Sequence, residues 1–148
     1  MNIKSVSISP TEQTPEWYTP VTKELLREIT RRIVKEFAPE RVILFGSYAY
    51  GDPTIHSDID LLIITKKLAE QSVFARARAV SPLFPDRKFG MDILVRTPQE
   101  VKARSAIGDD FISDILAQGR ILYEHRHGRR KTVKRVREFV RAKLGLDW

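Results

Sequence analysis

The sequence predicts an α/β (α+β) domain in which a small mixed sheet of three to four strands is covered by helices. Short runs of β-branched and aromatic residues follow one another along the chain, separated by segments whose apolar residues recur at helical spacing. The length of 148 residues favours one domain with an appendage, and 42% hydrophobic residues are enough to build a core. We find no internal repeat or low-complexity block.

The first predicted helix follows residues 1–20, which are rich in Ser, Thr and Pro and are expected to form an extended arm. Thr19 and Pro20 supply a cap and a proline in the first turn, and the helix must end before Pro39. Its apolar stripe, at four-residue spacing, consists of Val21, Leu25, Ile29, Ile33 and Phe37. Residues 41–45 then predict a short buried strand.

The middle of the chain predicts two more strands with a helix between them. Residues 58–64 form the second strand, and because its far half is apolar on both faces we place it inside the sheet. Residues 68–80 are helical in composition, and Ser81 and Pro82 close this helix. Residues 89–95 form the third strand.

The last part of the predicted domain contains two helices and a strand. Residues 97–100 form a capping box with proline at the first helical position, so a helix starts there. A second helix starts at about Asp109 and stops at Gly119. Its apolar face consists of Phe111, Ile112, Ile115 and Leu116. Residues 120–123 form the last short strand.

The net charge of +7 comes from the C-terminal end of the chain. Residues 126–148 contain nine basic and two acidic residues, whereas residues 1–125 contain 17 residues of each sign. We therefore divide the chain into the arm, a domain over residues 21–125 and a basic, amphipathic helical tail over residues 126–148. Three roles stay open for the tail: docking on the domain, contact with RNA phosphates, or binding of an acidic protein.

Composition also excludes several classes of protein. The chain has no cysteine, which excludes a disulfide framework, a zinc ribbon and a thiol nucleophile. Its longest aliphatic run, residues 61–64, is far too short to span a membrane. We expect a soluble, cytoplasmic protein with no membrane partner.

Three aspartates in the predicted strands point to a metal site. Asp58 and Asp60 are two residues apart, so their side chains leave the same face of a strand about 6.6 Å apart. Asp92 stands in an otherwise apolar strand, where an unpartnered carboxylate is costly. Carboxylate oxygens without thiols suit Mg²⁺ or Mn²⁺. A short Asp-x-Asp also occurs as a helix cap or loop decoration, and that alternative is weakened here by the strand context.

Gly46 and Ser47 follow the first strand and are candidates for phosphate binding. Glycine lets a phosphate approach the backbone, and the following amides and the Ser47 hydroxyl can donate hydrogen bonds to it. A phosphate corner beside paired carboxylates is what phosphoryl or nucleotidyl transfer requires.

This pattern resembles the signature of the minimal nucleotidyltransferases of the DNA polymerase β superfamily. Gly46-Ser47, ten intervening residues, Asp58-Ile59-Asp60 and the later Asp92 all fit, over about residues 25–124. The resemblance implies the nucleotidyltransferase fold, with Asp58, Asp60 and Asp92 holding two Mg²⁺ ions (or Mn²⁺) on the triphosphate of ATP or another nucleotide. It also implies that Gly46 and Ser47 grip the phosphates and that Asp92 helps to deprotonate the acceptor hydroxyl.

Many proteins of this type are antitoxins that transfer AMP from ATP to a tyrosine of a HEPN ribonuclease toxin, in a type VII-like toxin–antitoxin pair. The resemblance therefore implies a HEPN toxin as partner. Two alternatives stay open: action on tRNA or RNA ends, and a non-catalytic antitoxin that retains the motif. Tyr50 stands where many relatives carry arginine, and the candidates to compensate are Arg76, Arg78, Arg87 and Lys88.

Overall fold

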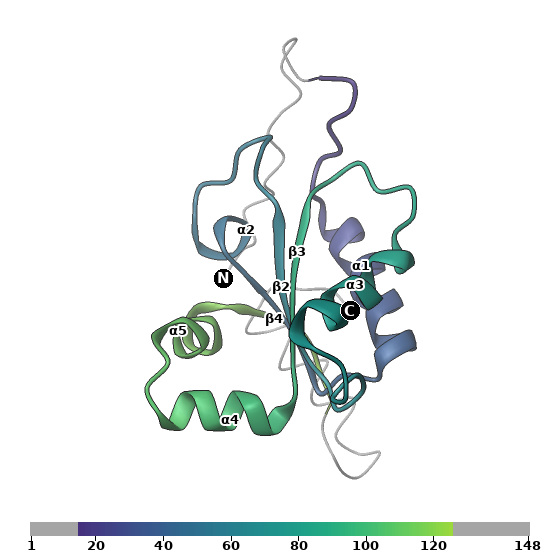
Figure 1. Ribbon diagram of the computed structural model, residues 1–148. Coiled ribbons are helices and arrows are strands. Elements are labelled where there is room, and N and C mark those ends of the chain that lie inside the picture. The colour runs from purple at the N-terminus through teal and green to yellow at the C-terminus, as the bar shows by residue number, and fades with distance from the viewer. Residues whose placement is uncertain (1–14, 126–148) are drawn as a thin grey trace, which may run out of the picture.

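The computed structural model describes residues 15–125, which form a four-stranded mixed sheet with helices on both faces (Figure 1). The strands are β1 (Arg41–Phe45), β2 (Ile59–Ile64), β3 (Met91–Arg96) and β4 (Arg120–Glu124). The helices are α1 (Lys23–Phe37), α2 (Ser47–Tyr50), α3 (Val73–Val80), α4 (Pro98–Ala106) and α5 (Asp110–Gln118), with a 3₁₀ turn over Ser81–Leu83. The predicted helical tail and most of the predicted arm lie outside the described residues, and residues 15–20 form neither helix nor strand.

The strand order is β3-β2-β1-β4, so β2 lies inside the sheet as predicted. β1 is antiparallel to both β2 and β4, whereas β2 and β3 are parallel. Because β2 and β3 are parallel, both begin at the same edge of the sheet. β1 runs toward that edge and delivers α2 to it. The topology thus places the start of two strands and of one helix together.

The sheet separates two apolar clusters. One contains Ile33 of α1 and Val80 of α3 packed against Leu61, and the other contains Ile115 of α5 packed against Leu62. Figure 1 shows α1 and α3 on one side of the strands and α4 and α5 on the other. Leu61 and Leu62 are both fully buried, which explains why the apolar run in β2 is continuous rather than alternating.

The predicted start of α1 was wrong by two to three residues. Thr22, not Thr19, is the N-cap, and its hydroxyl accepts a 3.1 Å hydrogen bond from the Leu25 amide. Val21 lies outside the helix but is buried with Leu26, the hydrophobic pair that often brackets such a cap. Val21 belongs to the core for this reason.

The helix predicted over residues 68–80 begins only at Val73, because Ser72 caps it. Leu68 has a positive φ of 69°, which takes the preceding segment out of helical geometry. The third strand is also displaced and covers Met91–Arg96. Phe111, predicted on the buried face of α5, is 55% exposed and touches Phe45 edge-on.

Other predicted boundaries are confirmed. β1 covers residues 41–45 as expected. The capping box of α4 is present in both directions, with the Glu100 amide donating to the Thr97 hydroxyl and the Glu100 carboxylate accepting from the Thr97 amide. Asp109 caps α5 and Gly119 ends it. These helices are fixed by local side-chain chemistry, which is why the sequence predicts them well.

Candidate functional site

The three predicted aspartates come together at the edge where β2 and β3 begin. Asp60 of β2 and Asp92 of β3 are direct partners in the parallel register. Asp58 precedes β2 and lies against Gly90, the residue before β3. A 2.9 Å hydrogen bond from the Ile59 amide to the Gly90 carbonyl joins the two strands at this point. The topology therefore groups carboxylates that are 34 residues apart in the sequence.

The grouping of the carboxylates shifts the pKa of one of them. Burial, and after it the negative charges of Asp92 and Asp58, together raise the pKa of Asp60 to about 6. A carboxyl whose pKa rises for these reasons is one that a cation would stabilise. The pKa of Asp60 is raised only by burial and by negative charges, and no neighbouring positive charge among the described residues lowers it.

Two glycines give the backbone close access to the carboxylates. A Cβ at Gly46 would overlap the Asp60 carboxylate, and a Cβ at Gly90 would overlap the Asp58 carboxylate. Gly46 also has a φ of 72°, which side chains rarely adopt. Sequence analysis singled out Gly46 but missed Gly90, although its position two residues before Asp92 was a usable signal.

The donor set fits a divalent metal ion, although the side chains are not arranged as a finished site. Within residues 15–125, no group of three His, Cys, Asp or Glu side chains is positioned to hold a metal ion. The in-register pair Asp60–Asp92, and Asp58 beside Gly90, bring only oxygen donors to one place, which is the chemistry Mg²⁺ prefers.

The α2 helix carries the predicted phosphate corner. Gly46 precedes it, and the Gly46 carbonyl accepts hydrogen bonds from the amides of Ala49 and Tyr50. Ser47 is its first residue, and within residues 15–125 no side chain caps this end of the helix. Arg120 of β4, which the sequence did not single out for this role, donates a 2.9 Å hydrogen bond from Nε to the Ala49 carbonyl. Arg120 thus holds the far end of α2 to the sheet.

The cations proposed to compensate for Tyr50 differ in their availability. Arg76 is buried and donates to the carbonyls of Leu68, Ala69 and Gln71, and to Glu100 at 2.7 Å. It is therefore a structural residue, and its predicted role toward phosphate is wrong. Arg78, Arg87 and Lys88 are exposed to solvent. Tyr50, at the end of α2, is also exposed, with 47% of its surface accessible.

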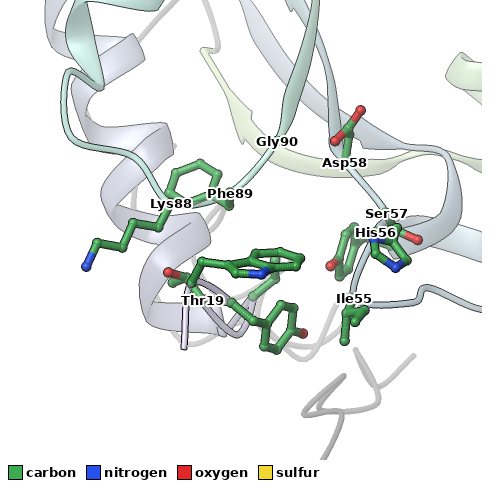
Figure 2. Close-up of a pocket in the computed structure, with 12 residues that line it drawn as sticks. Thr19, Ile55, His56, Ser57, Asp58, Lys88, Phe89 and Gly90 are labelled. Carbon is green, nitrogen blue, oxygen red and sulfur yellow. The ribbon is translucent and has the colours of Figure 1, made fainter. Parts of the chain in front are cut away.

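A pocket of about 290 Å³ lies beside the carboxylates (Figure 2). Asp58 and Gly90 border it, and Figure 2 shows the Asp58 carboxylate pointing away from Thr19 and Ile55. The rings that line it are those of Trp17, Tyr18, Tyr48, His56 and Phe89. Burial, followed by the neighbouring Tyr18 and Asp58, raises the pKa of Tyr48 to about 12. Nothing in the sequence linked the aromatic residues of the N-terminal segment to the aspartates.

Comparison with known proteins identifies the family. The model of the nucleotidyltransferase domain matches residues 24–140. The chain belongs to the nucleotidyltransferase domain family. The fold agrees: a "putative nucleotidyltransferase" of Sulfolobus solfataricus is similar in structure, with a TM-score of 0.51 and 27% sequence identity. The match covers 72% of this nucleotidyltransferase and 83% of the other chain.

Three proteins of Methanocaldococcus jannaschii, each named "putative protein adenylyltransferase", are similar in sequence. One is 24% identical over 123 residues, which are 79% of this nucleotidyltransferase and 82% of the relative. Another is 32% identical over 84 residues, or 57% and 78% of the two chains. The third is 46% identical over 48 residues, or 32% and 46%.

The chain is thus an enzyme of the nucleotidyltransferase kind, and it would bind a nucleoside triphosphate. Members of this family normally use divalent metal ions. Across residues 15–125, the helices of this nucleotidyltransferase are too short or too polar to cross a bilayer.

Proposed function

We propose that this nucleotidyltransferase moves AMP from ATP to an acceptor hydroxyl, using Asp58, Asp60 and Asp92 to hold Mg²⁺. The observation that carries the proposal is the register of Asp60 with Asp92, with Asp58 at the same sheet edge. Bound divalent ions supply neutralisation of the phosphate charge and a lower pKa for an oxygen nucleophile. Mn²⁺ would serve the same oxygen donors.

The remaining residues have defined tasks in this reaction. The amides after Gly46 and the Ser47 hydroxyl donate hydrogen bonds to phosphate oxygens, and Arg120 keeps α2 in place for this. The acceptor oxygen forms a bond to the α-phosphorus while the bond to the bridging oxygen breaks, and pyrophosphate leaves. Asp92, whose side chain is exposed, accepts the proton of the acceptor hydroxyl.

The acceptor we favour is a tyrosine of a HEPN toxin, which makes the chain the antitoxin of a type VII-like pair. The support is the name of the three relatives, "putative protein adenylyltransferase", which specifies a protein as acceptor. The balanced charge of residues 1–125 adds to this, because the catalytic domain then has no general attraction for RNA. An ATP substrate and a chain without cysteine both fit the cytoplasm.

Transfer to tRNA or RNA ends is the second candidate. It is favoured by residues 126–148, with nine basic residues against two acidic ones, because such a segment neutralises phosphates. In this version residues 21–125 catalyse the reaction and the tail holds the RNA. Removing residues 126–148 would then abolish both tRNA binding and tRNA labelling.

The test is an incubation of the protein with Mg²⁺ and ATP labelled in the α-phosphate. A purified HEPN-type protein and tRNA are offered in separate reactions. We expect label on a tyrosine of the protein, abolished by EDTA and by the Asp58→Ala, Asp60→Ala double variant. Asp86→Ala, an exposed aspartate outside the cluster, is the matched control.

The results separate the candidates. Label on tRNA alone would favour the RNA version. Equal transfer by the double variant would show that the site assignment is wrong. A double variant that transfers nothing yet still neutralises the toxin would identify a non-catalytic binding antitoxin.

A further inference from the structure

The N-terminal segment contributes a wall to the pocket beside Asp58. Trp17, Tyr18 and Thr19 line this pocket together with Tyr48 of α2 and His56 of the loop before β2. The family match covers residues 24–140, so Trp17 and Tyr18 lie outside the matched residues.

We propose that this pocket binds the nucleobase of the nucleoside triphosphate, stacked against rings of the N-terminal segment. The inference rests on the proposed function, since it takes the triphosphate to lie at Ser47. Tyr48 follows Ser47 directly in α2 and lines the pocket, as does Asp58. A nucleotide with its phosphates at the start of α2 therefore has the pocket next to it.

The composition of the pocket suits a flat heteroaromatic ring. Its side chains present aromatic faces, on which any base can stack. The rings of Trp17 and His56 have centroids 6.2 Å apart and are tilted by 35°, so they contact each other without parallel stacking. Trp17 is 53% exposed, although it is the largest aromatic side chain, and a stacked base would cover it.

A buried hydroxyl supplies the polar counterpart. Tyr18 Oη is buried and makes no well-formed hydrogen bond within residues 15–125, although it is close enough to Tyr48 to raise the pKa of that hydroxyl. A buried hydroxyl without a well-formed hydrogen bond is costly, and most such groups in proteins are satisfied. The ring nitrogens and exocyclic groups of a base can donate to or accept from this hydroxyl.

The pocket adjoins the carboxylate cluster through Asp58, and it adjoins the start of α2 through Tyr48. The competing occupant is the ring of an acceptor tyrosine. The binding experiments below separate the two.

Binding experiments test the inference without depending on catalysis. The chain has two tryptophans, so the Trp148→Phe variant leaves Trp17 as the single tryptophan, whose emission can be excited selectively over that of the tyrosines. We expect ATP and adenosine to change its emission, and inorganic tripolyphosphate to leave it unchanged. In calorimetry with Mg²⁺, Trp17→Ala should weaken ATP binding about tenfold and leave tripolyphosphate binding unchanged.

Further variants separate stacking from folding. Trp17→Phe keeps a ring and should recover most of the ATP affinity. Tyr18→Phe should weaken ATP binding several-fold with little change in the melting temperature, because its hydroxyl makes no well-formed hydrogen bond in the described structure. Phe74→Ala, which removes a 77% exposed ring from α3, is the matched control and should bind ATP like the unmodified protein.

Each contrary result has a distinct meaning. ATP binding that is unchanged in Trp17→Ala would overturn the pocket assignment and leave the proposed function standing. An emission change with N-acetyltyrosinamide but not with adenosine would overturn it in favour of an acceptor pocket. An unmodified protein that binds neither ATP nor tripolyphosphate would overturn both proposals.

Discussion

Asp60→Asn is expected to make the metal-free protein more stable at pH 8. In the folded chain, burial and the charges of Asp92 and Asp58 raise the pKa of Asp60 from 3.8 to about 6. The ionised carboxylate is therefore less favourable in the folded state than in the unfolded state. Asparagine has nearly the same shape and carries no charge, so the substitution removes this penalty.

The magnitude follows from the pKa shift. A shift of about two units corresponds to about 3 kcal/mol at 1.36 kcal/mol per unit. Asp60 is partly exposed, so solvent screening reduces the expected gain in unfolding free energy to about 1–2 kcal/mol. Because the pKa is raised in the folded state, the folded chain binds the extra proton between about pH 4 and pH 6, and stability falls as pH rises through that window. The gain of Asp60→Asn should therefore be full at pH 8 and absent below pH 4.

Urea unfolding in EDTA, followed by circular dichroism at pH 4 and pH 8, measures the gain. Asp86→Asn, an exposed aspartate in the loop before β3, is the matched control and should change stability by less than about 0.5 kcal/mol. An Asp60→Asn protein that is less stable than the unmodified protein at pH 8 would refute the reasoning. A gain that is equal at both pH values would refute the electrostatic cause.

Two further substitutions test the glycine beside Asp60 and the buried arginine of α3. In Gly46→Ala the new residue must adopt a positive φ, and its methyl group collides with the Asp60 carboxylate. The variant should lose about 1–3 kcal/mol of unfolding free energy in urea and transfer AMP about 100-fold more slowly. Transfer within twofold of normal would contradict this expectation. Arg76→Met leaves Glu100 and several loop carbonyls without their buried partner, so it should cost about 3–5 kcal/mol, whereas the exposed Arg78→Met should cost under about 0.5 kcal/mol in the same assay. Equal losses in the two arginine variants would count against a structural role for Arg76.

The sequence predicts those parts of the fold that depend on local chemistry. The capping box at Thr97 and the cap at Asp109 fix helix starts through hydrogen bonds three residues apart, and both are confirmed. The start of α3 was missed because residues 68–72 are also helical in composition. In the structure Ser72 caps the helix instead, and Arg76 donates to the carbonyls of Leu68, Ala69 and Gln71. Composition alone does not distinguish these two starts.

The same distinction applies to the site. The spacing of Asp58 and Asp60 and the single charge of Asp92 in an apolar strand were readable from the sequence. The burial cost expected for Asp92 was wrong, because its side chain is exposed at the end of the sheet. The parallel register that pairs Asp60 with Asp92 depends on the topology, and so does the contact of Gly90 with Asp58. The aromatic wall from residues 17–18 depends on how the chain enters α1, which composition does not encode.

The central claim is that Asp58, Asp60 and Asp92 together hold the divalent cations that serve a bound nucleotide. Equilibrium dialysis against Mn²⁺, with a non-hydrolysable ATP analogue at equal concentration on both sides, measures it directly. We predict about two Mn²⁺ ions per unmodified chain, and a loss of at least tenfold in Mn²⁺ affinity in the Asp60→Ala, Asp92→Ala double variant. Unchanged Mn²⁺ binding by a folded double variant would contradict the account.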